Sequence, residues 1–488
     1  MRNTIGKLLI GLLIPLSLMS CKLGPDFHSP SAPETRKYTE GPQPTHIKGA
    51  KTKGGEDQFL IIGEIPEKWW KLFHSNELNC LIKKGLARSP NLDAAFASLI
   101  QAQENRRAFV GQAFAPAITG QLSAQRERTN ESAFGIENVP PSVFSLYDAQ
   151  INVSYNLDFF GVNRRTLEGL CAEIHYKKYL LEAAYLTLTS NIVTTAITEA
   201  SLRAQIKATI EIIDSNEKEL DIIRKQFKLG GVSAIEVLAQ ETQLAQVKAT
   251  LPPLRKNLAA TRHALAVLIG EFPSEADLPH FSLDQLKLPT RLPVSLPSTL
   301  IRQRPDIRAS EALLHQASAN IGVATANLFP QISLTGNYGY QSDKIENLFT
   351  PSNNIWTIGG QLLQPIFNGG SLRAKRRASI AAFNEANAQY RQTVLQAFQN
   401  VADALRALEF DAKTLKAQTE SEQFAKKTLF LVQKQFKLGG VNYLDLLNAE
   451  RQYQQTKINR IQAQAARFTD TAALFQALGG GWWHRDCK

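Results

Sequence analysis

The chain has little of what several common protein classes require. Its 488 residues include four cysteines, at positions 21, 80, 171 and 487, and only two methionines. The cysteines lie far apart, and none has the Cys-x-x-Cys or cysteine–histidine spacing that binds zinc. We therefore expect no zinc site and no disulfide framework, and we interpret Cys80, Cys171 and Cys487 as buried small apolar residues.

Catalytic signatures and long apolar runs are also missing. Beyond residue 20 no apolar run is long enough for a membrane-spanning helix, which excludes a polytopic α-helical membrane protein. The eight histidines are scattered, and the His-Glu-x-x-His, Walker and dinucleotide-binding patterns do not occur. The Gly-Gly pairs at 230–231 and 439–440 lack the Lys-Ser/Thr of a phosphate-binding loop. We expect a protein that is not an enzyme and has no cofactor and no bound metal.

Positive charge is in excess, but it is not gathered into one run. Lys and Arg number 55 against 44 Asp and Glu, which gives a formal net charge of +11. A basic chain invites a nucleic-acid interpretation. Basic and acidic residues are interspersed, however, and aromatic residues, which would stack on bases, make up only 8%. We expect no nucleic-acid partner, and the 43% of apolar residues predicts an ordered chain.

The first 20 residues are typical of a targeting segment. Two basic residues precede an apolar stretch of about 13 residues, which is too short to span a bilayer. The stretch ends Leu-Met-Ser-Cys at 18–21, which resembles the lipobox of bacterial lipoproteins. In that family the chain is cut before the cysteine, whose thiol receives a diacylglycerol. The resemblance makes Cys21 the expected lipidation site, and Lys22 in place of aspartate favours the outer membrane.

One octapeptide occurs twice. Lys-Gln-Phe-Lys-Leu-Gly-Gly-Val spans 225–232 and recurs at 434–441, an offset of 209 residues. Other landmarks repeat at nearly the same offset, such as Ser-Pro-Asn at 89–91 and Arg-Pro-Asp at 304–306. Two copies this far apart predict an internally duplicated module and exclude a solenoid of short repeats.

Each copy predicts helix, strand, loop, strand, very long helix, tight turn and long returning helix. Residues 163–229 and about 371–438 contain no proline, which predicts two helices of about 100 Å. Each reverses at Gly-Gly and returns over about 35 to 40 residues. In the second copy the apolar residues between 394 and 436 recur with the 3.5-residue period of a coiled coil. We expect Pro90 and Pro305 to begin the first helix of each copy, and Pro116 and Pro330 to end it.

Four segments alternate apolar and polar residues. They follow Pro116, cover 150–159 and 332–341, and run near Trp356. Such alternation suits a strand with one lipid-facing and one wet face, although a half-buried strand of a soluble sheet shows it too. Four strands in a membrane would leave open edges and could not close a useful barrel. If the strands enter a membrane, several chains must share one barrel.

These motifs jointly resemble the TolC-type outer-membrane factors, in particular the OprM/NodT-like lipoproteins of efflux systems. The resemblance covers essentially the whole mature chain. Its motifs are Cys-Lys-Leu-Gly-Pro-Asp-Phe at 21–27, Trp-Trp-Lys-Leu-Phe at 69–73, Leu-Pro-Pro-Leu-Arg at 251–255, Leu-Pro-Ser at 296–298, Arg-Pro-Asp-Ile-Arg at 304–308, Ile-Gly-Val-Ala at 321–324, Phe-Pro at 329–330 and Ala-Leu-Gly-Gly-Gly-Trp at 477–482. The resemblance implies a mainly α fold with a membrane β-barrel. Three chains would each give four strands to a 12-stranded barrel, and their long coiled hairpins would form an α-barrel tunnel.

The repeat and the resemblance together divide the chain into six segments. These are a lipoprotein signal peptide at 1–20, a lipid-anchored linker and equatorial segment at 21–88, repeat 1 at 89–269, an equatorial connector at 270–304, repeat 2 at 305–478 and an equatorial tail at 479–488.

The resemblance implies a passive exit duct that spans the outer membrane of a Gram-negative bacterium and projects into the periplasm. The implied partners are two further copies of the chain in a homotrimer, a periplasmic adaptor, an inner-membrane pump of the resistance–nodulation–division class, and outer-membrane lipid. Adaptors in this family contact the hairpin tips. In this sequence the tips are Phe227, Lys228, Leu229, Gly230, Gly231 and Val232, and Phe436, Lys437, Leu438, Gly439, Gly440 and Val441. Gly-Gly explains a tight turn by itself, so the adaptor role rests on the resemblance.

The resemblance also implies a periplasmic gate at the tips. Relatives carry an acidic ring one turn before the second tip, whereas this sequence has Gln433 and Lys434 near that place. We therefore expect an iris closed by apolar and polar contacts. Its candidate residues are Leu429, Val432, Gln433, Phe436 and Asp445. Four lysines would make the tips basic, namely Lys225, Lys228, Lys434 and Lys437.

Two other functions remain open at this point. A duct for type I protein secretion would share the same channel, although the lipobox, Trp69-Trp70 and the Arg-Pro-Asp at 304–306 favour the efflux branch. A structural coiled-coil lipoprotein that spaces membrane from cell wall would explain Cys21 and the helices. It would not explain four amphipathic strands that are duplicated together with their helices.

Overall fold

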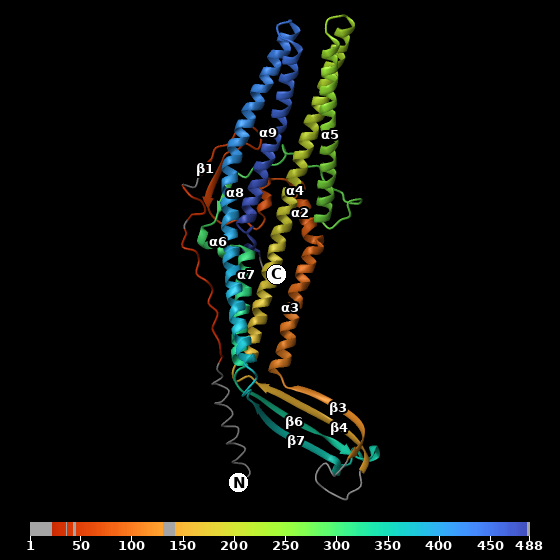
Figure 1. Ribbon diagram of the computed structural model, residues 1–488, viewed down its shortest axis with the longest axis vertical. Helices are drawn as coiled ribbons and strands as arrows, with labels where there is room; N and C mark the ends of the chain where they lie inside the picture. Colours follow the sequence, from red (N-terminus) through yellow and green to blue (C-terminus); the bar gives the residue numbers. More distant parts are fainter. Residues whose placement is uncertain (1–21, 36, 42–44, 130–141, 486–488) are drawn as a thin grey trace. The chain divides into compact units, whose positions relative to one another are not determined.

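The computed structural model is mainly helical and forms two compact units (Figure 1). It describes residues 22–35, 37–41, 45–129 and 142–485. The strand unit comprises Met1–Pro30, Ser98–Lys177 and Ala309–Tyr390. The hairpin unit comprises Ser31–Ala97, Lys178–Arg308 and Arg391–Lys488.

The two longest helices have the same length. α4 (Val162–Lys228) and α8 (Ser371–Lys437) each contain 67 residues, which corresponds to about 100 Å at 1.5 Å per residue. Neither contains proline, and Gly169 is the only glycine in either, so the backbone hydrogen-bond ladder continues throughout. Both bounds confirm the expected helices to within one residue.

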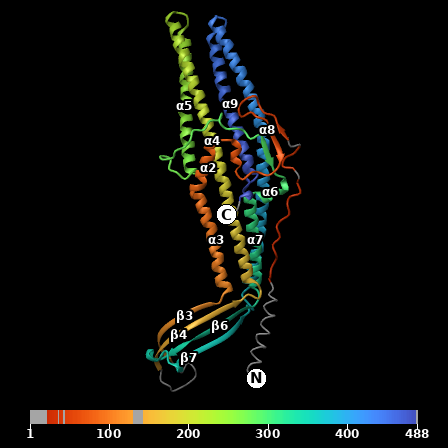
Figure 2. The same ribbon diagram turned by 180° about the vertical axis from the view of Figure 1, so that it is seen from behind.

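A shorter helix follows each long one and runs back beside it. α5 (Ala234–Leu268) follows α4 and α9 (Tyr443–Ala477) follows α8, and each has 35 residues. Figures 1 and 2, which show opposite sides, both place α5 next to α4 and α9 next to α8. α5 continues through Pro252 and Pro253, which are both exposed. The expected returning helices are confirmed.

One stretch of α4 is long and apolar enough, by length and composition alone, to cross a membrane. This corrects the expectation that no such stretch follows residue 20. The core helix of a soluble unit passes the same test, and Leu188, Ile192, Val193 and Ile197 of α4 are buried in the core of the hairpin unit.

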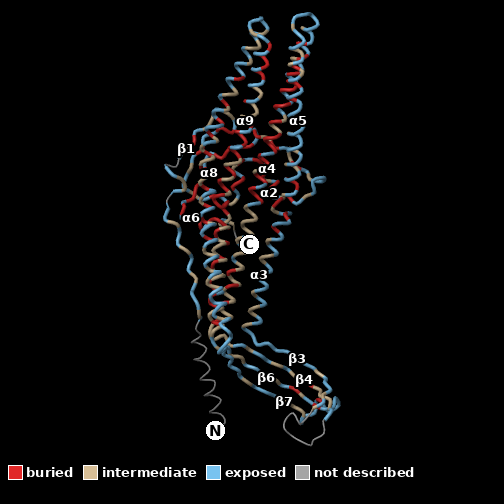
Figure 3. Tube along the Cα trace, viewed as in Figure 1, coloured by how far each residue is buried: buried red, intermediate tan, exposed pale blue. Residues whose placement is uncertain are grey.

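The core of the hairpin unit joins segments that are distant in the sequence. Trp69 and Phe73 of η1 (Trp69–Phe73) are fully buried and pack against Phe475 and Phe468 of α9. α2 (Asn76–Arg88) and α6 (Pro297–Gln303) add apolar side chains to the same cluster. Figure 3 shows buried residues gathered where these segments surround the helices. Removal of this apolar surface from water is the main source of stability for the unit.

The hairpin unit also contains a three-stranded sheet in the order β1-β2-β5. β1 (His46–Ile47) is antiparallel to β2 (Gln58–Ile62), and β2 is parallel to β5 (Arg291–Val294). This sheet was not predicted from the sequence, because strands of two to five residues are too short to show alternation.

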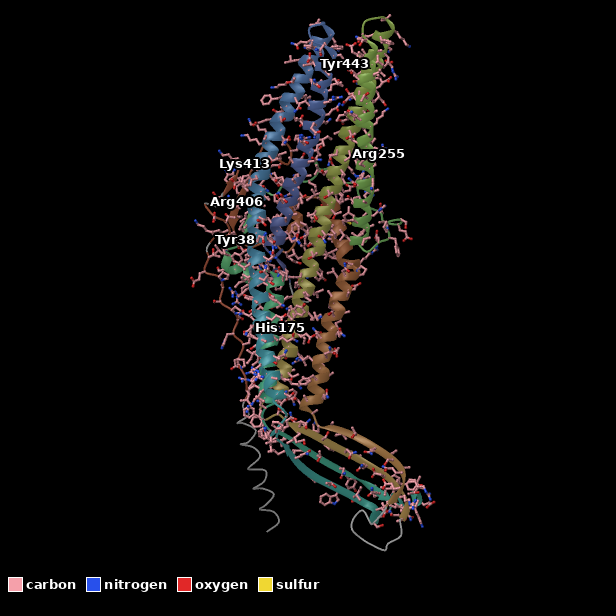
Figure 4. All side chains as sticks on the ribbon, viewed as in Figure 1. Tyr38, His175, Arg255, Arg406, Lys413 and Tyr443 are labelled. Carbon is pink, nitrogen blue, oxygen red and sulfur yellow. The ribbon has the colours of Figure 1, made fainter. Side chains whose placement is uncertain are left out.

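Residues just before this sheet pack on α8. The Tyr38 hydroxyl donates to the backbone oxygen of Ser295 at 3.0 Å, and its ring lies 5.6 Å from that of Phe398. Arg406 donates to the backbone oxygen of Glu40 at 2.6 Å. Figure 4 labels Tyr38 and Arg406 on this side of α8. Burial raises the pKa of Tyr38 to about 12, so its hydroxyl remains a donor at physiological pH.

The strand unit contains a four-stranded antiparallel sheet in the order β3-β4-β6-β7. The strands are β3 (Ala117–Thr129), β4 (Ser142–Leu157), β6 (Gln331–Ser342) and β7 (Asn354–Leu363). They confirm the four expected strands, except that Asp158 and Phe159 lie beyond the end of β4. β3 and β7 are the edges of the sheet, and neither has a second partner in the part of the chain that the structure describes.

The remaining helices frame these elements. α3 (Pro90–Phe114) and α7 (Pro305–Ala326) begin at the expected prolines. α3 ends two residues before Pro116, but α7 ends earlier than expected because residues 327–329 form turns that precede Pro330. Three short 3₁₀ helices are η3 (Ile345–Asn347), η4 (Pro351–Asn353) and η5 (Trp482–His484).

Candidate functional sites: the amphipathic sheet and the hairpin tips

The register of the four-stranded sheet separates an apolar face from a polar face. Cross-strand partners share a face, and successive residues of a strand point to opposite faces. One row of partners across all four strands is Ile118, Val153, Gly336 and Ile358. The adjacent row, on the other face, is Thr119, Asn152, Asn337 and Thr357. The pairing of strands from the two halves of the chain therefore builds one continuous apolar surface.

Most of this apolar surface is exposed, although Phe349 packs on Tyr340 at one end of it. Leu122 is 82% exposed, Ile358 81% and Trp356 67%. Figure 3 shows the four strands mainly in the colours of exposed and intermediate residues. A soluble protein seldom leaves so contiguous an apolar face in water, whereas a lipid-facing strand requires one.

Both hairpins reverse through the same backbone turn. After α4 the N–H of Gly231 donates to the Gln226 oxygen, and that of Gly230 donates to the Phe227 oxygen, both at 2.9 Å. Gly230 has φ +74°, which glycine adopts without a Cβ clash. The same two hydrogen bonds recur 209 residues later after α8, with Gly439 at φ +74°. The predicted tips are therefore two copies of one helix-ending motif.

The helices that leave the two tips are capped in different ways. Glu236 accepts from the backbone N–H of Ser233 at 2.7 Å, just before α5. Before α9 the side chain of Asn442 accepts from the backbone N–H of Asp445 at 2.9 Å. Asp445, a predicted gate residue, is exposed in the first turn of α9, where a helix favours an acidic side chain.

The two tips expose apolar side chains at matching positions. Leu229 and Leu438 are 86% and 87% exposed, and Ile235 and Leu444 are exposed beyond them. Among the predicted adaptor-contact residues, Val232, Phe436 and Val441 are half-buried and the others are exposed. An apolar side chain with a lysine beside it at each tip suits contact with another protein.

Three of the predicted gate residues pack within the chain. Leu429, Val432 and Phe436 surround a buried cluster that includes Tyr443 and Leu446. Gln433 lines a groove of about 560 Å³ between the two tips. The structure thus brings Leu429, Val432 and Phe436 together and leaves Asp445 on the exposed first turn of α9.

A row of polar contacts that was not predicted from the sequence joins the two hairpins. The Tyr443 hydroxyl, labelled in Figure 4, donates to the side-chain oxygen of Gln240 on α5. Farther along, Arg451 donates to Gln243 at 2.6 Å, and Gln243 donates to Gln454 at 3.2 Å. A sequence signal existed: at the offset of 209, Tyr443 corresponds to Ala234, so the two copies differ where they meet.

Two acidic groups face each other near these contacts. Glu450 of α9 is 5% exposed, and burial, followed by the nearby Glu219 carboxylate of α4, raises its pKa to about 7. Burial also raises the pKa of Glu219, while Lys437 partly opposes that shift. The contact between the hairpins therefore contains a carboxyl group that titrates near neutral pH.

The remaining predicted sites are resolved in part. Cys21 and Cys487 lie outside the described residues. Cys80 is an exposed free thiol and Cys171 a half-buried one, so the expected burial is wrong for Cys80, which lies on the outer side of α2. Within the described stretches, no three His, Cys, Asp or Glu side chains gather in a way that could hold a metal ion.

Known proteins of similar sequence are described as outer membrane proteins of efflux or export. A probable efflux pump outer membrane protein of Pseudomonas putida, TtgC, is 29% identical over 485 residues, with 98% of this chain and 96% of that protein aligned. The pyoverdine export outer membrane protein OpmQ of Pseudomonas aeruginosa is 28% identical over 91% of this chain and 94% of its own length.

Solved structures agree with these relatives. The outer-membrane channel OprN superposes with a TM-score of 0.85 at 26% identity and covers 95% of this chain and 100% of its own. The CmeC channel of Campylobacter jejuni shares the fold, with a TM-score of 0.83 at 23% identity over 94% and 95% of the two chains. A family model described as outer membrane efflux protein matches residues 81–271 and 296–480. The chain therefore belongs to the outer membrane efflux protein family.

Proposed function

We propose that the chain is the exit duct of a tripartite efflux system in the outer membrane of a Gram-negative bacterium. It conducts drugs and other toxic small molecules passively to the outside. A resistance–nodulation–division pump in the inner membrane supplies the energy, and a periplasmic adaptor joins the pump to the duct. Membership of the family and relatives named as efflux pump outer membrane proteins support this proposal. The same relatives favour efflux over type I protein secretion and over a structural spacer.

The observation that carries the proposal is the open, two-faced sheet. Its apolar face is exposed, its other face is polar, and β3 and β7 have free edges in the described part of the chain. Free backbone edges are not tolerated in hydrocarbon. Pairing of β7 of one copy with β3 of the next removes every edge when three copies close a 12-stranded barrel. The polar face then lines a wet lumen.

The long helices extend the duct beyond the membrane. A helix of about 100 Å exceeds the roughly 30 Å hydrocarbon layer threefold, so most of α4 and α8 lies in the periplasm. The internal duplication gives each chain two such hairpins, and three chains build an α-barrel tunnel. Residues 21–88, 270–304 and 479–488 form the equatorial belt. The thiol of Cys21 carries the lipid.

The hairpin tips receive the adaptor and hold the gate. The exposed Leu229 and Leu438 supply apolar contacts, and the Gly-Gly turns allow a partner helix to approach the backbone. Leu429, Val432, Gln433, Phe436 and Asp445 form the closed iris at the periplasmic end.

The size and shape of the detergent-extracted protein test the proposal. Analytical ultracentrifugation should give a particle of three chains with a high frictional ratio. Reconstituted into a planar bilayer, the particle should conduct ions. A compact monomer without conductance would overturn the shared barrel and return the strands to a soluble sheet.

A further inference from the structure

A fully buried arginine in the strand unit binds the first described residues of the chain. Arg165, near the start of α4, has a side chain that is 1% exposed. Its Nε donates to the backbone oxygen of Leu23 at 2.9 Å, and its Nη2 donates to that of Gly24 at 3.0 Å. Its guanidinium also pairs with Asp26 at 3.0 Å and with Glu168 at 2.9 Å. Three of these four acceptors belong to residues 23–26, so loss of that segment would leave a buried charge poorly satisfied.

Further contacts hold both ends of this segment. Lys22 pairs with Glu168 at 2.8 Å, and the ring of Phe27 stacks on that of His315 at 4.3 Å. His315 in turn contacts Glu168 at 3.0 Å. The pKa of Glu168 falls to about 2: burial opposes the shift, but hydrogen bonds from Lys22, His315 and Arg165 outweigh it. Glu168 therefore stays ionised, and the Lys22 pair persists, at any physiological pH.

Two glycines allow the segment to lie directly on a helix. A Cβ on Gly24 would come within 2.4 Å of the Cα of Gly322 in α7, and Gly24 has φ +93°. A Cβ on Gly322 would come within 2.7 Å of the Arg165 side chain. No other residue type fits either position without displacement of backbone or of the buried guanidinium.

The segment is bound beside the end of a strand. The backbone N–H of Leu23 donates to the oxygen of Phe160 at 3.4 Å, and Phe160 lies three residues beyond β4. Residues 22–27 have no helix or strand of their own, so tertiary contacts such as these hold the segment in place.

We propose that Arg165, Glu168 and Gly322 form a receptor for the chain's own segment Lys22–Phe27, which fixes the lipid attachment point at the end of β4. The proposal rests on the proposed lipidation of Cys21 and on strands that enter the membrane. If these six residues were a free tether, the lipid could move by about 20 Å relative to the strands. The bound segment instead keeps the lipid at the membrane depth of the end of β4. The lipid and the strands, which both anchor the chain in the membrane, therefore act as one unit.

The rate of chymotrypsin cleavage after Phe27 in the detergent-extracted protein tests this receptor. Cleavage at the exposed tip residue Leu229 serves as the internal reference. The wild-type Phe27 site should be protected. Arg165→Gln and Gly24→Ala should each raise its rate about tenfold or more, because cleavage follows opening of the segment. Arg165→Lys should give an intermediate rate.

Two controls make the result decisive. Arg107→Gln removes an exposed arginine of the same unit that pairs with Glu104 at 2.5 Å, and it should leave the rate unchanged. Gly24→Ala lies in the segment itself, so it tests the receptor even if Arg165→Gln misfolds. Rapid wild-type cleavage at Phe27, or wild-type rates in both Arg165→Gln and Gly24→Ala, would overturn the receptor. Mass spectrometry that finds no lipid on the wild-type N-terminus, with Phe27 still protected, would overturn the lipid anchor but not the bound segment.

Discussion

At the residue scale, buried charged side chains hold the connecting segments on the helices. Arg467 of α9 is fully buried and donates to the backbone oxygen of Glu56 at 2.6 Å, next to β2. Burial lowers its pKa, and nearby acids, including Glu56, oppose that shift. Glu199 of α4 accepts from Arg203 and from the backbone N–H of Phe281, and so fixes the connector before β5. Removal of either charged side chain would leave buried polar partners unsatisfied.

Glu450 should make the contact between the two hairpins pH-dependent. Its pKa is raised to about 7 in the folded chain, so between the unfolded value of 4.5 and 7 the folded state binds one more proton. Stability then falls as pH rises through this window, by on the order of 1–3 kcal/mol. Glu450→Gln should remove this loss. Its Tm, measured by circular dichroism, should therefore fall less between pH 5 and pH 8 than the Tm of the wild type.

An exposed glutamate of the same region is the control for this result. Glu241→Gln affects a surface pair with Arg224 and should leave the pH dependence of the Tm as in the wild type. Equal Tm shifts between pH 5 and 8 in the wild type and Glu450→Gln would show that Glu450 is not the titrating group. The charges of Glu219, Lys437 and Arg451 also influence this site, so these three residues are kept unchanged in every variant that is compared.

At the element scale, alternation along each strand decides which solvent each face meets. β7 offers a matched pair, because Ile358 lies on the apolar face and its neighbour Thr357 on the polar face. Ile358→Lys should cost about 2–4 kcal/mol per chain if its face meets hydrocarbon. The outer-membrane yield and the fraction of assembled trimers should fall sharply, as measured by membrane fractionation and native electrophoresis.

Thr357→Lys introduces the same charge on the same strand and should be tolerated, because its face meets water. If both variants assembled equally well, the apolar face would not meet lipid. If Thr357→Lys alone failed, the faces would be reversed.

At the scale of the whole molecule, the charge of the tips should govern ion selectivity. Lys225 pairs with Asp221 at 2.5 Å and Lys437 lies near the Glu219 carboxyl, so these two charges are partly balanced, whereas Lys434 lies 4.3 Å from the uncharged ring of Phe430 and keeps its full charge. Three copies of each on a narrow axis would oppose cation entry. The reconstituted channel should therefore show little cation preference, as measured by the reversal potential in a salt gradient.

Charge reversal at one tip lysine sharpens this prediction. Lys437→Glu should shift the reversal potential toward cation selectivity, more strongly at low salt. Lys413→Glu, which alters an exposed lysine paired with Glu409, should have a smaller effect. A strongly cation-selective wild-type channel would contradict control of the entrance by a basic tip.

The sequence by itself determined the features that depend on local patterns. The bounds of α4 and α8 follow from long stretches without proline, and both reversals follow from Gly-Gly at an offset of 209. The four strands follow from alternation, and helix starts at Pro90 and Pro305 follow from the fixed φ of proline. These features need only a residue and its near neighbours, so a single sequence suffices.

Only the tertiary structure decided how distant segments meet. It joined β4 to β6 and so made one apolar face from two copies, and it paired β2 with β5 across more than 200 residues. In the tertiary structure Glu450 is buried near Glu219, and Arg165 donates hydrogen bonds to the backbone oxygens of Leu23 and Gly24. Nothing local marks these partners, because burial, pKa shifts and buried hydrogen bonds arise only when packing removes water from groups far apart in the chain.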